Sequence, residues 1–73
     1  MKILAVDDDP FIRELFPIMF ETDELTDLSI AEGGKEALEI LNVADEPFDC
    51  FLLDVDMPEM DGIELCKRIR DLP

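Results

Sequence analysis

The chain has 73 residues, enough for one small domain, and 48% of them are hydrophobic, which argues against a disordered chain. It carries 6 basic and 20 acidic residues, for a formal net charge of -14. Nucleic acids and anionic membranes would repel such a surface, so direct binding to either is not expected, whereas cations and basic partner surfaces are favoured.

An apolar run at residues 3–6 opens the chain and is typical of a strand that is covered on both faces in a parallel sheet. Residues 7–9, which follow it, are consecutive aspartates. The last of them is suited to cap a first helix that begins at Pro10 and has a wide apolar face. Because Pro17 would cost about 3 kcal/mol in a helix interior, we expect this helix to kink or end near Phe16.

A second strand and helix are predicted in the middle of the chain. Residues 28–31 form a short strand, and Gly33 and Gly34 interrupt the chain after it. The helix that follows ends before Pro47, because the residue before a proline disfavours helical geometry. Its apolar stripe consists of Ala37, Leu38, Leu41 and Ala44.

The third strand is predicted at residues 48–53 and leads directly into Asp54. An acidic loop broken by Pro58 and Gly62 follows, so a carboxylate stands at the end of a buried strand. Asp61 can cap a third helix, with Glu64 three residues on as its reciprocal partner. The apolar side of that helix consists of Leu65, Cys66, Ile69 and Leu72.

Three successive strand-then-helix units predict an α/β fold, with a parallel sheet and helices on both of its faces. The C-terminal ends of all the strands then lie at one edge of the sheet, where α/β proteins place their chemistry. Asp7, Asp8 and Asp54 would gather at this edge if the first and third strands are neighbours.

Three neighbouring carboxylates raise one another's pKa, so a proton or a cation must compensate their charge. Mg²⁺ suits a site made of oxygen ligands, and the nearby start of the first helix would favour a phosphoryl group formed on Asp54. The plainer alternative is that residues 7–9 only cap a helix in a solvated loop and that Asp54 is an ordinary acid at a strand end.

Three motifs resemble the receiver domain of two-component response regulators, and the resemblance covers residues 1–73. They read Ile-Leu-Ala-Val-Asp-Asp-Asp-Pro, Glu-Gly-Gly-Lys-Glu-Ala-Leu and Leu-Leu-Asp-Val-Asp-Met-Pro-Glu-Met-Asp-Gly. The resemblance implies a three-layer flavodoxin-like fold with sheet order 2-1-3. It also implies that the chain is a partial receiver domain, which contains the first three βα units and stops after the third helix.

The same resemblance implies roles for the acidic residues. Asp54 would accept a phosphoryl group from a sensor histidine kinase or a phosphotransfer protein, in a reaction that needs Mg²⁺. Asp8 and Asp54 would bind the ion directly, Asp7 would bind it through water, and the backbone carbonyl of Asp56 would supply a further ligand. Such a domain phosphorylates itself, so no turnover of an external substrate is expected.

The chain also departs from the family, whose fourth strand ends in Ser or Thr and whose fifth ends in Lys. The sequence stops where the fourth strand would begin, and none of Lys2, Lys35 and Lys67 ends a strand. We therefore expect phosphorylation to be impaired. We also expect the third strand to form an exposed edge through which the chain associates with a second copy of itself.

Three other functions fit parts of the pattern. Asp54 and Asp56 match the Asp-x-Asp motif of haloacid-dehalogenase-type phosphatases, but Pro58 stands where that family usually has Thr or Val. An EF-hand calcium loop would need a ligand in place of Pro58 and a glycine in place of Glu59. An acidic assembly module without phosphorylation is the main alternative, because half of the family's site is absent.

The remaining features predict the cellular compartment. Cys50 and Cys66 lie on apolar segments with no neighbouring His or Cys, so we interpret them as small core residues in a reducing compartment. Residues 1–6 are too short for the core of a signal peptide, and no stretch approaches the roughly 18 apolar residues of a membrane-spanning helix. The sequence therefore predicts a cytoplasmic protein.

Overall fold

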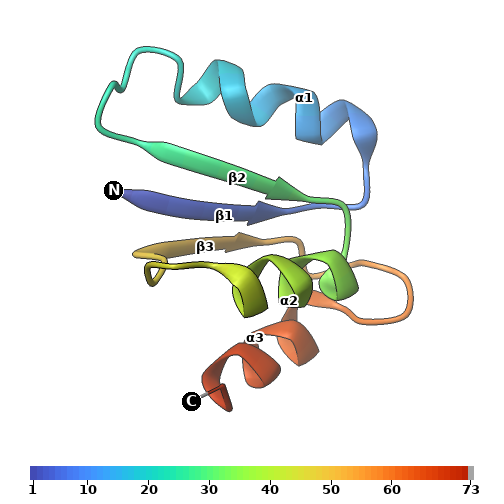
Figure 1. The fold of residues 1–73 in the computed structure, drawn as a ribbon. Helices are drawn as coiled ribbons and strands as arrows, with labels where there is room; N and C mark the ends of the chain where they lie inside the picture. The colour runs from blue at the N-terminus through green and yellow to red at the C-terminus, as the bar shows by residue number, and fades with distance from the viewer. Residues whose placement is uncertain (73) are drawn as a thin grey trace.

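The computed structural model describes residues 1–72, in which strands and helices alternate along the chain (Figure 1). The elements are β1 (Lys2–Val6), α1 (Pro10–Met19), β2 (Asp27–Ala31), α2 (Gly34–Val43), β3 (Cys50–Leu53) and α3 (Gly62–Arg70). The strands are parallel, in the order β2-β1-β3, with Ile3 of β1 between Leu28 of β2 and Cys50 of β3. The predicted α/β fold and sheet order are confirmed.

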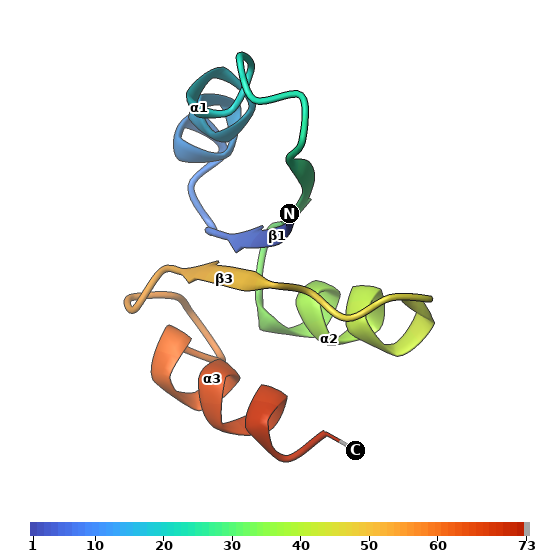
Figure 2. The same ribbon diagram turned by 90° about the vertical axis from the view of Figure 1, so that its left-hand side faces the viewer.

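The sheet is the middle layer of three. Figure 2 shows α1 on one face and both α2 and α3 on the other. Leu4 and Val6 of the central strand are almost fully buried, together with Leu65 of α3. On the opposite face, the buried side chain of α1 is Phe16. The continuous apolar run of β1 therefore reflects a strand that is covered on both sides.

The structure corrects the expected end of α1. The helix was expected to kink or end near Phe16; it continues through Pro17 to Met19, so the expected end is wrong, and the kink stays a prediction. Proline removes one backbone hydrogen bond, whereas the burial of the neighbouring Phe16 contributes about 2 kcal/mol. Packing of α1 on the sheet therefore offsets most of the cost of the proline.

The structure also refines β3 and the cap of α3. The strand begins at Cys50 instead of residue 48, and the Phe48 ring packs beside Lys2, whose Nζ lies 4.6 Å from the ring centre. Asp61 caps α3 as predicted, because its side chain accepts from the backbone N–H of Glu64 at 2.9 Å. The Glu64 carboxylate, however, accepts from Arg68 Nε of the same helix.

Two features from which the cellular compartment was predicted can be compared with the structure. Cys50 and Cys66, which were interpreted as small core residues, are free thiols that are half-buried and do not belong to the buried core. Within residues 1–72, none of the helices has the length and apolar character needed to cross a membrane.

Candidate metal centre

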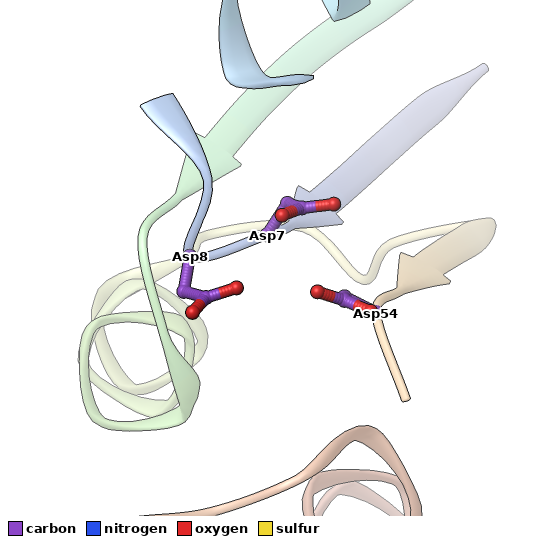
Figure 3. Close-up of side chains that lie close together, drawn as sticks. All are labelled: Asp7, Asp8 and Asp54. Carbon is purple, nitrogen blue, oxygen red and sulfur yellow. The ribbon is translucent and has the colours of Figure 1, made fainter. Parts of the chain in front are cut away.

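Three aspartates from two loops meet at the C-terminal edge of the sheet (Figure 3). One carboxylate oxygen from each of Asp7, Asp8 and Asp54 lies within 4.8 Å of the other two. The pairing of β1 with β3 explains this convergence, because Val6 and Leu53 are register partners and the next residue of each strand leaves the sheet at the same level. The backbone N–H of Asp54 continues the ladder by donating to the Val6 carbonyl at 3.0 Å.

Local hydrogen bonds orient two of these carboxylates. Asp7 Oδ1 accepts from the backbone N–H of Asp9 at 2.9 Å, and Asp54 Oδ1 accepts from the backbone N–H of Asp56 at 3.2 Å. Each bond uses one lone pair of one oxygen, and an ionised carboxylate offers about four. In Figure 3 the carboxylates of Asp8 and Asp54 point toward one another from the two loops, so oxygen atoms remain available between them.

The electrostatics of the cluster favour a cation. Partial burial raises the pKa of Asp7, the hydrogen bond from Asp9 opposes this shift, and the negative charges of Asp54, Asp8 and Asp9 add to it. Among residues 1–72, the only ion pair joins Arg68 and Glu64, so no basic side chain forms an ion pair with the three aspartates. A set of oxygen donors that carry negative charge and form no ion pair fits a hard divalent ion such as Mg²⁺.

A close backbone contact holds the loop that follows Asp54. A Cβ atom added to Gly62 would lie 2.2 Å from the carbonyl oxygen of Asp54 and 3.1 Å from the Cα of Val55. The backbone N–H of Gly62 also donates to the Val55 carbonyl at 3.2 Å. The start of α3 therefore packs directly against the backbone of Asp54, one of the three clustered aspartates.

The importance of Gly62 was missed from the sequence, which suggested only a loop break. A signal was present, since glycine is a poor helix former and yet here it directly follows the capping residue Asp61. Such a glycine in the first turn of a helix indicates a close approach of another backbone.

The rest of the loop is anchored in the core. Met57 is 7% exposed and belongs to the same buried cluster as Leu65, whereas Glu59 takes a left-handed conformation with φ of 67°. Asp56 is exposed, and its proposed role as a ligand through its carbonyl stays a prediction. A buried methionine between exposed loop residues keeps the acidic loop on the sheet edge.

None of Lys2, Lys35 and Lys67 lies at the C-terminal end of a strand. Lys2 begins β1, at the far edge of the sheet from the aspartates, where its Nζ donates to the Glu46 carbonyl at 3.0 Å. Lys67 lies in α3, and Lys35 in α2 lines a cavity of about 610 Å³ that also includes Asp8.

Comparisons with known proteins find relatives that match almost the whole chain. A sequence model of the response regulator receiver domain matches residues 3–73. An uncharacterised 14.6 kDa protein from Leptolyngbya boryana is 48% identical over 73 residues, which are all of this chain and 53% of that protein.

Two solved structures are similar in fold and in sequence. The N-terminal domain of a response regulator receiver protein from Methanoculleus marisnigri JR1 has a TM-score of 0.86 at 42% identity, over 99% of this chain and 56% of that one. The receiver domain of the histidine kinase CKI1 from Arabidopsis thaliana, solved in complex with Mg²⁺, has a TM-score of 0.77 at 31% identity, over 94% of this chain and 55% of that one. The chain thus spans about half the length of these relatives.

Proposed function

The chain belongs to the response regulator receiver domain family, and on that basis we propose that it accepts a phosphoryl group on Asp54 in a Mg²⁺-dependent step of two-component signalling. Receiver domains are signalling domains, and turnover of an external substrate is not part of this proposal. The observation that supports it most strongly is the convergence of Asp7, Asp8 and Asp54, whose oxygens lie within 4.8 Å of one another.

The proposed chemistry is a phosphoryl transfer from a phosphohistidine. An oxygen of the Asp54 carboxylate attacks phosphorus in line, the new O–P bond forms as the P–N bond breaks, and the electron pair stays on the departing imidazole, which takes up a proton. Mg²⁺ bound at the site would neutralise charge on the phosphoryl oxygens. In our proposal Asp8 and Asp54 hold the ion directly, Asp7 holds it through water, and the Asp56 carbonyl contributes a further oxygen.

The proposed partner is a sensor histidine kinase or a phosphotransfer protein in the cytoplasm. One of the similar structures is the receiver domain of a histidine kinase, which supports a role in the same kind of signalling. The net charge of -14 favours a partner with a basic surface and disfavours nucleic acids and anionic membranes. The reaction is expected to be slow, because residues 1–72 provide no lysine at the end of a strand beside the site.

Replacing the proposed direct ligand Asp8 tests the metal site. We expect Asp8→Ala to weaken Mg²⁺ binding by about 100-fold, as measured by isothermal titration calorimetry, because one of the three carboxylates is lost. The control is Asp45→Ala, which removes the same charge from the connection between α2 and β3, at the other edge of the sheet. Equal affinities of the Asp8→Ala and Asp45→Ala variants would contradict the assignment.

A second proposal concerns association of the chain with a second copy of itself. Among residues 1–72, β3 pairs only with β1, so its outer edge is open to another strand. Phe11 and Ile18 of α1 are also 67% and 59% exposed, which leaves apolar surface uncovered. We propose that the β3 edges of two copies meet antiparallel across a twofold axis.

Sedimentation velocity at increasing protein concentration tests this association. We expect a dimer whose population rises with salt, because salt screens the repulsion between two copies that each carry a charge of -14. A folded monomer at high concentration in both low and high salt would contradict the proposal. This outcome would also argue against a function as a self-associating assembly module.

A further inference from the structure

The peptide group between Asp7 and Asp8 is held by a side chain from α1. Arg13 Nη1 donates a hydrogen bond to the Asp7 carbonyl oxygen at 3.0 Å, in a half-buried position. The backbone N–H of Arg13 donates to the Asp9 carbonyl at 3.0 Å, in the first turn of the helix. One end of this side chain is thus fixed by the helix, and the other end holds the peptide that joins two of the three clustered aspartates.

The guanidinium group makes this contact without forming an ion pair. The chain has 20 acidic residues, yet among residues 1–72 the only ion pair joins Arg68 and Glu64. Because Arg13 bonds a backbone carbonyl, the carboxylate oxygens of Asp7 and Asp8 remain available to a cation. An arginine that bonded either carboxylate would compete with the metal for the same lone pairs.

We propose that Arg13 is a positioning residue of the metal centre, which holds the Asp7–Asp8 peptide in the orientation that directs these carboxylates toward Asp54. The inference rests on the proposed function, since the metal centre belongs to that function. The two carboxylates extend from the Cα atoms on either side of this peptide, so a rotation of the peptide would move both of them. Groups that orient metal ligands without contacting the ion typically change metal affinity by about 10-fold to 100-fold.

The direction of the change in Mg²⁺ affinity when Arg13 is replaced distinguishes a positioning role from a purely electrostatic one. Removal of a positive charge beside a cation site strengthens cation binding, because a repulsive interaction is lost. Loss of positioning weakens binding, because the ligands are no longer held in place. A decrease in Mg²⁺ affinity when Arg13 is replaced therefore cannot come from its charge.

Isothermal titration with Mg²⁺ tests the inference on the wild type and on Arg13→Met, which removes the donor but keeps an unbranched apolar stem. We expect about 10-fold weaker binding for Arg13→Met and less than about 3-fold change for Arg13→Lys, which keeps a charged donor. The matched control is Arg68→Met. It removes a cation that lines the cavity shared by Arg13 and Asp8, and we expect unchanged or slightly tighter binding of Mg²⁺. Thermal unfolding of each variant verifies that it is folded.

The outcomes separate this inference from the proposed function. A wild-type chain that does not bind Mg²⁺ would contradict the proposed function itself. A wild type that binds, together with a folded Arg13→Met variant of equal or higher affinity, would overturn only the role of Arg13. If Arg13→Met does not fold, Arg13→Gln, whose shorter side chain holds its amide farther from the Asp7 carbonyl, is expected to show the same loss, and equal affinity there would overturn the role.

Discussion

Replacement of Asp54 by Asn is expected to abolish phosphoryl uptake from acetyl phosphate. The amide has no anionic oxygen to attack phosphorus, so the loss should be complete rather than partial. The substitution preserves the shape of the side chain, and its carbonyl oxygen can still accept the hydrogen bond that the Asp56 N–H donates to Asp54. The measurement is the intact mass of the protein after incubation with acetyl phosphate and Mg²⁺.

The control for this experiment is Asp45→Asn, which changes an exposed aspartate in the connection between α2 and β3, at the other edge of the sheet, and should leave uptake unchanged. Uptake that persists in Asp54→Asn would place the acceptor elsewhere. A wild-type chain that takes up no phosphoryl group would favour the acidic assembly module. Steady release of phosphate from a phosphomonoester, instead of a single stoichiometric phosphorylation, would favour the haloacid-dehalogenase alternative.

A methyl group at position 62 is expected to disrupt both the fold and the site. In Gly62→Ala the Cβ atom would lie 2.2 Å from the Asp54 carbonyl oxygen, and a clash with backbone atoms cannot be relieved by rotation of a side chain. Overpacking of this kind costs about 3 kcal/mol. For a domain of this size, that corresponds to a fall in melting temperature of more than about 10 °C. Thermal unfolding followed by circular dichroism measures the change.

Gly33→Ala is the matched control for this substitution. A Cβ atom at Gly33 would have no neighbour within 4 Å, and the backbone there is extended, with φ of -174°. Alanine is a poorer N-cap than glycine, so we expect a loss of no more than about 1 kcal/mol. Similar melting temperatures for Gly62→Ala and Gly33→Ala would show that the close approach of α3 to Asp54 does not limit stability.

The convergence of Asp7, Asp8 and Asp54 could be predicted from the chain because it has local signals. The apolar runs that precede Asp7 and Asp54 indicate buried strands, and parallel strands bring their C-terminal ends to one edge. Asp61 was likewise predicted as the cap of α3 from its place before an apolar helical stripe. Each of these inferences depends on a periodicity or on a cap only a few residues long.

Other features could not be predicted, because they depend on contacts between elements. The end of α1 is one example, since the cost of Pro17 can be estimated from the chain, whereas the burial of Phe16 against the sheet cannot. The N-terminal boundary of β3 is another. Apolar residues occur back to Phe48, with Asp49 as the one polar residue among them, but pairing with β1 begins at Cys50.

The amino-acid sequence by itself determined the order of the elements, the α/β class and the aspartates that gather at one edge, because hydrophobic periodicity and strand direction are properties of short segments. Only the tertiary structure decided how that edge is supported. Gly62 touches the backbone of Asp54, and Arg13 holds the peptide between Asp7 and Asp8. Both contacts depend on where a helix begins relative to a strand end in space. A glycine after a helix cap indicates that another backbone comes close, but it does not say which one.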